Sequence, residues 1–182
     1  MMSDLEKIIL SETVIQDRVK ELGEQITRDY MGKNPVLIGI LKGAMTFMAD
    51  LIRMIPLKLK FDLIAVSSYG ASTRSSGTVR IQKDLDIDIE GCHVIIVEDI
   101  IDTGLTLHYI IENLRARHPE TLKLCTLLDK PMKRKVPIRP DYNGFEISDD
   151  FVVGYGLDYA ENYRNLPCIG ILKEEIIKDG NS

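Results

Sequence analysis

One stretch of the sequence decides the fold, and it reads Val94-Ile95-Ile96-Val97-Glu98-Asp99-Ile100-Ile101-Asp102-Thr103-Gly104-Leu105-Thr106. Its first part, from His93 to Val97, is apolar and rich in β-branched residues, which predicts a strand covered on both faces, as in a parallel sheet. Glu98 and Asp99 follow at the C-terminal end of that strand. Open α/β sheets bind their ligands at this end, so we expect a ligand beside the acidic pair.

The residues after the acidic pair predict a tight turn into a helix. Apolar residues recur at helical spacing from Leu107 to Leu114, so the helix begins at the bend formed by residues 103–106. A helix start offers backbone N–H groups, the positive end of the dipole and here two hydroxyls, which together suit a phosphate. The neighbouring carboxylates suit a ribose diol or a hydrated Mg²⁺, which prefers one or two carboxylates plus substrate oxygens.

Two simpler interpretations of this stretch stay open. The acidic pair can merely end a strand while Thr103 caps a helix, with no ligand at all. The pair can also be half of an ATPase site, but the chain has no G-x-x-x-x-G-K-[ST] phosphate loop to accompany it. This argues against a kinase or an ATPase.

Length and composition are typical of one ordinary globular domain. The chain has 182 residues, of which 45% are hydrophobic and 28% charged, enough to bury a core. A net charge of −5 argues against a general nucleic-acid-binding surface. Cys92, Cys125 and Cys168 lack disulfide or zinc spacing and are interpreted as reduced thiols. Without a signal peptide or a membrane-spanning apolar run, we expect a cytoplasmic protein with no membrane partner.

A second strand–turn–helix unit precedes the first. Val36 to Ile40 is a fully apolar strand, and it is followed by Leu41-Lys42-Gly43 and then by a helical pattern from Phe47 to Ile55. This pattern predicts a second helix-start anion site, with a lysine in it. A surface turn explains the same residues equally well. Beside the first site, however, it supplies the second half of a binding site for a ligand with phosphates at both ends.

Other segments are predicted to support these two units. Ser11 should cap a helix whose apolar face is Ile15, Val19, Leu22, Ile26 and Tyr30. Leu57 to Ser67 alternates, with Phe61 among the apolar positions and Asp62 among the polar ones, which predicts a half-buried strand. Of the basic residues 130–139, only Lys130 lies at a strand end facing the predicted site. The rest is interpreted as a solvated loop.

The stretch at 94–106 resembles the phosphoribosyl pyrophosphate (PRPP) motif of the type I phosphoribosyltransferases. The likeness extends from about Val36 to Arg164, and residues 150–159 are similar to the hypoxanthine-guanine branch. The resemblance implies a Rossmann-like, mostly parallel sheet with helices on both faces and a small hood. It implies one domain over residues 1–182, with a core at about 36–150 and a hood built from the N-terminal segment and about 151–182.

The resemblance also implies an activity, that of a glycosyltransferase in purine salvage. The 5-phosphoribosyl group would pass from PRPP to N9 of hypoxanthine or guanine in a Mg²⁺-dependent reaction, giving IMP or GMP and pyrophosphate. Glu98 and Asp99 would bind the ribose hydroxyls and their metal. The 5′-phosphate would contact Asp102, Thr103, Gly104, Leu105 and Thr106. Asp102 is also the best candidate for the general acid/base, beside N7 of the base.

Further site residues follow from the resemblance alone. Leu41, Lys42, Gly43 and Arg164 would contact pyrophosphate, and the Leu41–Lys42 peptide can be cis. Asp158 would hold a second Mg²⁺ near pyrophosphate. A homodimer or homotetramer is usual in the family.

The purine side is expected to be lined by Lys130, Phe151, Val152 and Asp158. Lys130 would donate to the 6-oxygen, because an ammonium is only a donor. Phe151 would stack on the ring, and the backbone of Val152 would read the base. Ser68 and Tyr69 match the family's flexible loop, a lid over the reacting centre, although residues 67–77 can equally be an inert surface loop.

Two competing functions remain at this point. One is a phosphoribosyltransferase for another base, such as xanthine-guanine or adenine. Lys130 and Phe151 argue against adenine, whose 6-amino group is itself a donor. The other is a regulator that keeps the motif as a sensor and binds nucleic acid, but the chain is acidic and has no length for a DNA-binding region. Leu105 departs from the family, which often has a polar residue there.

Overall fold

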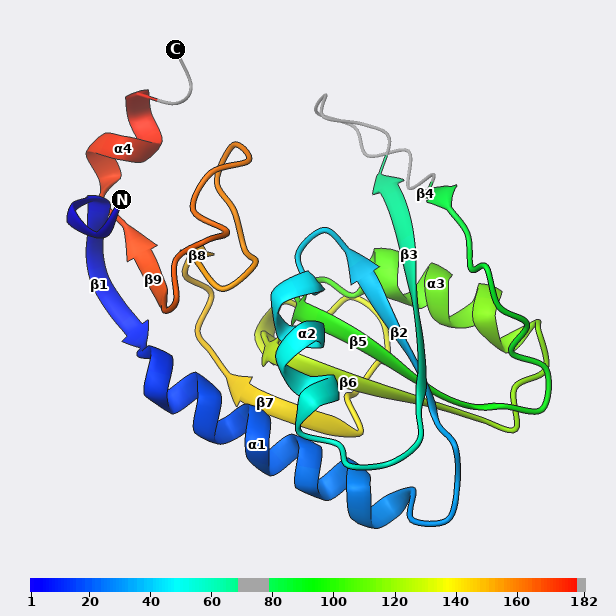
Figure 1. Ribbon diagram of the computed structural model, residues 1–182. Helices are drawn as coiled ribbons and strands as arrows, with labels where there is room; N and C mark the ends of the chain where they lie inside the picture. The colour runs from blue at the N-terminus through cyan, green and yellow to red at the C-terminus, as the bar shows by residue number, and fades with distance from the viewer. Residues whose placement is uncertain (69–78, 180–182) are drawn as a thin grey trace.

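The computed structural model describes residues 1–68 and 79–179 and contains two sheets (Figure 1). The larger sheet has the strand order β4-β3-β2-β5-β6-β7. Neighbouring strands are parallel except for β3 and β4, which are antiparallel. The predicted mostly parallel α/β sheet is therefore confirmed. Its strands are β2 (Val36–Leu41), β3 (Lys60–Ser68), β4 (Val79–Lys83), β5 (His93–Ile101), β6 (Thr121–Asp129) and β7 (Tyr142–Glu146).

Helices cover both faces of this sheet, as predicted (Figure 1). Helices α1 (Glu12–Asp29) and α2 (Met45–Arg53) pack in one apolar cluster with Leu37 and Ile95. Helix α3 (Leu105–Arg115) packs in another with Ile38 and Ile96. Successive strand residues point to opposite faces, so a strand covered on both faces must be apolar throughout. This is why the central strands are continuous apolar runs.

Helix α1 is capped and oriented as the sequence predicts. Its N-cap is Ser11, whose hydroxyl accepts from the Val14 N–H at 3.4 Å, and the predicted apolar face is buried. Arg18 donates from the same helix to the carbonyls of Asn143 and Gly144, at 2.6 and 2.9 Å. The helix is thereby attached to the edge strand β7.

The two ends of the chain meet in the smaller sheet. It has the antiparallel order β1-β9-β8, with β1 at Leu5–Leu10, β8 at Val152–Val153 and β9 at Ile169–Leu172. A separate apolar cluster that includes Val153, Leu166 and Cys168 fills it. The Tyr155 hydroxyl donates to Asp50 of α2 at 2.6 Å, which ties this part of the chain to the large sheet. Short helices complete the description: η1 (Met2–Asp4), η2 (Pro131–Lys133) and α4 (Glu174–Asp179).

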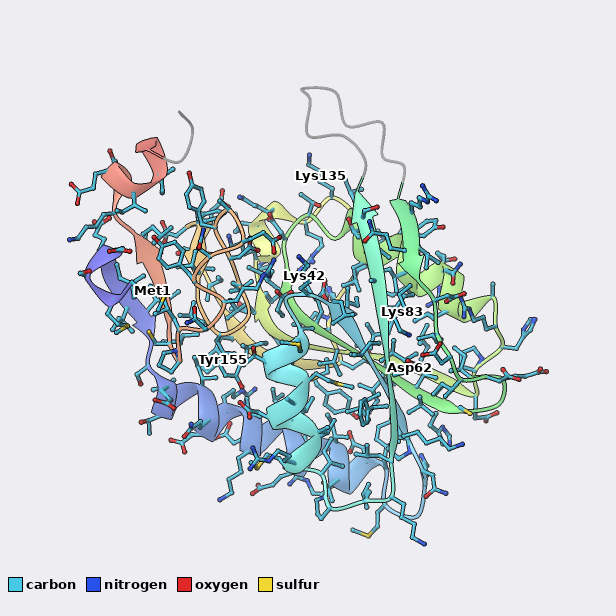
Figure 2. All side chains as sticks on the ribbon, turned by 45° about the horizontal axis from the view of Figure 1, so that its top comes forward. Met1, Lys42, Asp62, Lys83, Lys135 and Tyr155 are labelled. Carbon is cyan, nitrogen blue, oxygen red and sulfur yellow. The ribbon has the colours of Figure 1, made fainter. Side chains whose placement is uncertain are left out.

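Strand β3 corrects the sequence prediction, because its polar and apolar positions are not buried as expected. Phe61 is 55% exposed, whereas Asp62 is only 8% exposed. Asp62 accepts from the backbone N–H groups of Leu63, Asp86 and Ile87 at 2.7, 2.7 and 3.2 Å. These bonds repay the burial of the carboxylate. Figure 2 shows Asp62 near Lys83 on the side of β3 and β4.

Two further expectations touch the limits of the described chain. Across residues 1–68 and 79–179, no helix is both long and apolar enough to cross a bilayer. Strand β3 ends at Ser68, and Tyr69, the other residue predicted for the lid, lies outside the described residues. The lid stays a prediction.

The chain reverses its direction of winding between β2 and β5. From β2 it passes to β3 on one side, and later returns to β5, β6 and β7 on the other side. In open α/β sheets the crevice at such a switch point, outside the carboxyl ends of the strands, is where ligands bind. Gly39 in β2 and Val97 in β5 are the last residues paired between these two strands. A ligand is therefore expected beside the residues that follow them.

Candidate active site

Glu98 and Asp99 lie directly beyond the last paired residues of β2 and β5. Strand β5 continues to Ile101, further than predicted, because it stays paired with β6 after its pairing with β2 has stopped at Val97. The acidic pair therefore lies within the strand, not after it, and it faces the switch point. A strand held on only one side leaves room on the other for a ligand.

The environment of these carboxylates disfavours their charge. Burial raises the pKa of Glu98 well above its usual value, and the neighbouring charge of Asp99 adds to the effect. Burial also raises the pKa of Asp99 to about 6, against the opposing N–H of Ile100, at 2.8 Å, and the charge of Arg164. Among the described residues, the Oε2 atom of Glu98 is buried without a hydrogen-bond partner. The pair would be stabilised by a cation.

The loop after β2 packs against this pair. The Leu41–Lys42 peptide is cis, as the resemblance implied. A Cβ atom added at Gly43 would overlap the Asp99 carboxylate, so only glycine fits there. Gly156, at φ +103°, packs in turn on the carbonyl of Gly43. Three segments that are distant in sequence therefore meet at the switch point.

The bend at 103–106 has the predicted geometry of a helix start. Helix α3 begins at Leu105, and its N-cap, Gly104, is in the left-handed region at φ +81°, which glycine adopts without strain. Thr103 Oγ1 accepts from the Leu105 N–H at 3.4 Å. The half-exposed side chain of Leu105 takes no part in this geometry, consistent with a role for its backbone only. The turn is confirmed, and the phosphate in it stays a prediction.

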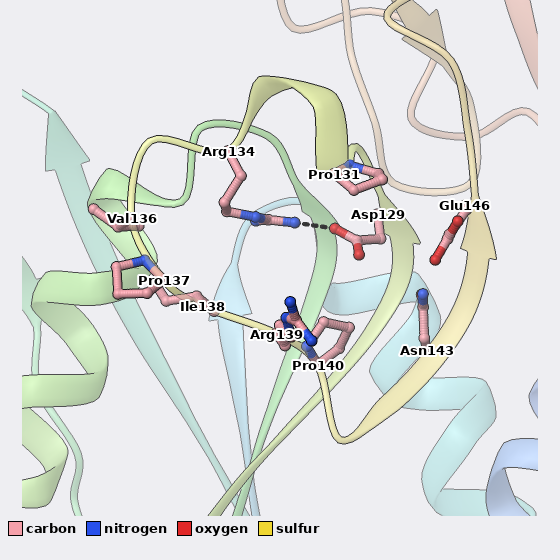
Figure 3. A pocket seen from close by; sticks show the side chains of 10 residues that line it. All are labelled: Asp129, Pro131, Arg134, Val136, Pro137, Ile138, Arg139, Pro140, Asn143 and Glu146. Carbon is pink, nitrogen blue, oxygen red and sulfur yellow. Dashed lines mark hydrogen bonds and ion pairs between the residues drawn. The ribbon is translucent and has the colours of Figure 1, made fainter.

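Arg134 packs against this bend, a role that the sequence did not predict. We interpreted it as part of a solvated loop, but it is only 12% exposed and forms an ion pair with the buried Asp129 (Figure 3). Its Cδ lies 3.3 Å from where a Cβ of Gly104 would be, and the next residue, Lys135, donates its N–H to the Thr103 carbonyl at 2.9 Å. A run of like charges gives no signal of which member is paired.

Arg134 also lines a cavity of about 700 Å³ under the connection between β6 and β7 (Figure 3). Asp129 and Glu146 line the same cavity. Neither Glu98 nor Lys130 does, so this hollow is separate from the switch-point crevice.

Lys130 and Asp102 flank the other side of the bend. Lys130 is 5% exposed and donates to the carbonyl of Asp150 at 2.7 Å. Burial lowers its pKa, and the charge of Asp102 opposes this. Asp102 lies 3.9 Å from Lys133, and its Oδ1 atom is buried without a hydrogen-bond partner among the described residues. The contact with Lys133 is long, which leaves the Oδ1 oxygen available to a ligand.

The predicted purine contacts lie next along the chain from Asp150. Phe151 is half exposed and stands edge-on to Tyr159, with ring centroids 5.8 Å apart. Val152 is buried in β8, where its backbone is paired with β9. The bond from Lys130 to Asp150 brings the amine close to the start of this segment. An exposed aromatic face beside a buried amine suits a planar base with a carbonyl oxygen.

Arg164 lies in the loop between β8 and β9. Its guanidinium lies 2.8 Å from Asp158 Oδ1 and donates to the carbonyl of Gly156 at 2.8 Å. Glu161 contacts it at 3.4 Å and also reaches Lys42 at 2.8 Å. Sequence reasoning missed Glu161. Its spacing of three from both Asp158 and Arg164 was a signal available in the sequence.

The residues present fit a magnesium ion only in part. No group of three or more histidine, cysteine or acidic side chains is gathered for a metal in the described parts of the chain. Glu98 and Asp99 are adjacent, and Glu98 has an unpartnered buried oxygen. Mg²⁺ keeps waters and takes most ligands from substrate, so two carboxylates suffice. Asp158, the third predicted ligand, is engaged by Arg164 and by the Glu161 N–H.

A mostly parallel sheet with two helix starts and an acidic pair at its switch point defines an α/β protein of the class that binds anionic ligands at the carboxyl ends of its strands. The family pattern described as the phosphoribosyl transferase domain matches residues 7–160. The chain therefore belongs to the phosphoribosyltransferase family.

Individual relatives agree with this assignment. The hypoxanthine-guanine phosphoribosyltransferase of Bacillus subtilis (strain 168) is 56% identical over 176 residues, which cover 97% of this chain and 98% of that protein. A crystal structure of a hypoxanthine phosphoribosyltransferase from Staphylococcus aureus is similar with a TM-score of 0.93 at 52% identity, covering 97% and 96% of the two chains. A hypoxanthine phosphoribosyl transferase of Trypanosoma cruzi gives 0.92 at 43% identity, covering 97% and 96%.

Proposed function

We propose that this enzyme transfers the 5-phosphoribosyl group of PRPP to N9 of hypoxanthine or guanine, giving IMP or GMP and pyrophosphate in purine salvage. One observation carries the proposal: the acidic pair, the Gly43 loop and the helix start at 103–106 meet at one switch point. A ligand with a phosphate at one end, a diphosphate at the other and a diol between them matches these three features. The names of the relatives agree with this substrate class.

In this proposal each part of PRPP has its own contacts. Glu98 and Asp99 bind the ribose hydroxyls and Mg²⁺. The bend from Asp102 to Thr106 binds the 5′-phosphate through its N–H groups and hydroxyls. Lys42, with the backbone of Leu41 and Gly43, binds pyrophosphate together with Arg164. When bound, Mg²⁺ supplies positive charge that offsets the charge of the departing pyrophosphate.

The base side completes the reaction. Lys130 donates to the 6-oxygen, the face of Phe151 stacks on the ring, and the backbone of Val152 reads the ring edge. Asp102 manages the proton at N7 while N9 attacks the sugar. The unpartnered Oδ1 of Asp102 supports this role, because an acid/base group must be able to form a new hydrogen bond with the substrate.

The division of labour between the two sheets is part of the same proposal. We assign the whole chain to one domain, with a core at about 36–150 and a hood from the N-terminal segment and 151–182. The two sheets and their separate apolar clusters support this division. Asp158 as a second metal ligand, the homodimer or homotetramer, and the cytoplasmic location stay predictions. Light scattering of the purified protein tests the assembly.

An assay with PRPP, Mg²⁺ and each of four purines tests the function. We expect nucleotide from hypoxanthine and guanine and none from adenine, because adenine presents a donor to the donor Lys130. Xanthine carries the same 6-oxygen and is included to define the limit of the pocket. Formation of AMP, or no product from any 6-oxopurine, would contradict the proposal.

A crystal soaked with IMP and Mg²⁺ tests the placement of the ligand. The phosphate should lie in the bend at 103–106, with the ribose hydroxyls beside Glu98 and Asp99. A phosphate bound elsewhere would remove the geometric basis of the proposal even if the activity were present.

A further inference from the structure

Glu161 joins the two cations that are proposed to bind pyrophosphate. Its Oε2 atom lies 2.8 Å from Lys42 Nζ, and its Oε1 atom lies 3.4 Å from Arg164 Nη2. Lys42 belongs to the loop after β2, whereas Glu161 and Arg164 belong to the loop after β8. One carboxylate therefore bridges the crevice at the place where a phosphate group is expected.

The backbone around Glu161 is built to present this carboxylate. Ala160, Glu161 and Tyr163 have φ values of +50°, +64° and +75°. Non-glycine residues rarely adopt this left-handed region, and those that do concentrate at functional sites. Three hydrogen bonds hold the turn: the Glu161 N–H donates to Asp158 Oδ2 at 2.9 Å, and Tyr159 and Asn162 exchange backbone hydrogen bonds at 3.1 and 3.0 Å.

We propose that Glu161 is an internal competitor of pyrophosphate. In the free enzyme its carboxylate occupies the position of a phosphate oxygen on Lys42 and, more weakly, on Arg164, until PRPP or pyrophosphate displaces it. Glu161 is in this sense a residue that sets affinity, and it takes no part in the chemical step. The inference rests on the proposed function, because it needs pyrophosphate to bind between these two cations.

The energetics favour a competitor that is easily displaced. The side chains of Lys42 and Glu161 are 67% and 65% exposed, and exposed ion pairs contribute little free energy. The hydrogen bond and charge of Lys42 lower the pKa of Glu161, which is therefore ionised at neutral pH. A triply or quadruply charged diphosphate outcompetes one carboxylate, and the returning carboxylate then helps pyrophosphate to leave.

Arg164 is arranged so that it keeps capacity for a ligand. Its contacts with Asp158 and with the Gly156 carbonyl, both at 2.8 Å, are shorter than its contact with Glu161 and orient the guanidinium. Within the described residues, its Nε atom is buried and has no hydrogen-bond partner. Losing Glu161 therefore leaves the guanidinium in place.

Titration calorimetry of the nucleotide-free enzyme with pyrophosphate and Mg²⁺ tests the inference. We expect Glu161→Gln to lower the dissociation constant of pyrophosphate by about two- to fivefold, the size expected for loss of one exposed ion pair. The matched control is Glu112→Gln, which removes an exposed i,i+3 pair with Arg115 on α3 and should change nothing. Both variants should melt within a degree or two of the wild type.

A double-mutant cycle identifies the cation through which Glu161 acts. Lys42→Met should weaken pyrophosphate binding by itself, and in that background Glu161→Gln should give a much smaller gain. Unchanged or weaker pyrophosphate binding by Glu161→Gln, or an equal gain without Lys42, would overturn the inference. If the wild type makes IMP from PRPP and binds pyrophosphate, such a result leaves the proposed function intact. If the wild type does neither, both fall.

Discussion

Two strands of the same sheet carry a largely buried aspartate, and the surroundings of the two are opposite. Asp62 in β3 accepts three backbone N–H groups and lies 3.5 Å from Lys83. Asp99 in β5 accepts one, from Ile100, and has another carboxylate, Glu98, next to it. Burial alone would raise the pKa of Asp62, but its hydrogen bonds and Lys83 outweigh this and lower it. Burial dominates at Asp99 and raises its pKa to about 6.

The contrast separates a structural carboxylate from one that awaits a ligand. The partners of Asp62 come from the protein itself, so its charge stabilises the fold. Asp99 has few such partners, so its charge is unfavourable in the free protein. Carboxylates of this kind are expected where a cation or a substrate supplies the missing contacts. Asp62 has three backbone donors and a lysine, whereas Asp99 has one backbone donor, and this difference in partners separates the two roles.

The largest effect on activity is expected at Asp102, the third carboxylate of the crevice. Like Glu98, it has an oxygen atom without a hydrogen-bond partner among the described residues. Asp102→Asn should lower kcat by about 10²–10⁴-fold, the usual contribution of a general acid/base, while PRPP binding changes little. Single-turnover kinetics separate the two quantities. Full activity in this variant would mean that Asp102 is not the general acid/base, although its Oδ1 atom has no hydrogen-bond partner.

Filling the space beside Asp99 is the second way to test the comparison. Gly43→Ala places a methyl group where the Asp99 carboxylate lies, and we expect kcat/KM to fall by about 100-fold, as for a displacement of about 1 Å in a site. The control is Gly91→Ala. It has no atom within 4 Å of the added Cβ and a φ of +65°, so it should cost some stability and leave kcat/KM unchanged.

Removing the satisfied carboxylate should affect folding and leave catalysis alone. Asp62→Ala leaves three part-buried backbone N–H groups without their acceptor, and we expect a loss of about 3 kcal/mol in the free energy of unfolding. Urea denaturation measures this loss, and kcat of the remaining folded enzyme should stay the same. Asp17→Ala, on the exposed side of α1, should change stability by less than about 0.5 kcal/mol.

The pH dependence of stability should have opposite signs at the two aspartates. Asp99, raised from an ordinary 3.8 to about 6, stabilises the fold fully below its unfolded pKa and loses that contribution as pH rises through about 6. Asp62, whose pKa is lowered, contributes above its unfolded pKa and loses the contribution as pH falls through the folded value.

Urea denaturation at a series of pH values checks these signs. Asp99→Asn should remove the loss of stability between about pH 4 and 6.5. Asp62→Asn should flatten the acid side of the curve. Curves for Asp99→Asn that run parallel to the wild type would contradict a raised pKa.

The smallest effect is expected at Lys83, the exposed partner of Asp62. Lys83→Met should cost less than about 1 kcal/mol, because three backbone donors still hold the carboxylate and the lysine is partly solvated. A loss as large as that of Asp62→Ala would mean that the charge of Lys83, rather than the backbone, satisfies Asp62.

The sequence correctly predicted those parts of the fold that depend on neighbouring residues. The strand, turn and helix around residues 93–114 follow from a continuous apolar run, Gly104 and helical spacing, all within a few residues of one another. The alternation in β3 was misinterpreted, because the N–H groups that satisfy Asp62 come from Asp86 and Ile87, more than twenty residues away. Local patterns carry no information about such donors.

The candidate site shows the same limit. The acidic pair and the bend were identified because the strand, the carboxylates and the helix start all lie in one short stretch of sequence. Arg134 and Glu161 were missed, because each acquires its role from a partner on another element, Gly104 and Lys42 respectively. The resemblance to a family supplied the cis peptide at Leu41–Lys42, which no local pattern indicates.

The smaller sheet has a consequence for how the protein is made. Strand β1 (Leu5–Leu10) is synthesised well before its partner β9 (Ile169–Leu172), so the two strands can pair only after all the residues between them have been made. Strand β8, next to Phe151, also pairs with β9 alone. The loop after β2 and the stretch at 98–106 precede β9 by more than sixty residues, so a nascent chain contains the acidic pair and the start of α3 long before β9 is available to pair with β8 beside Phe151.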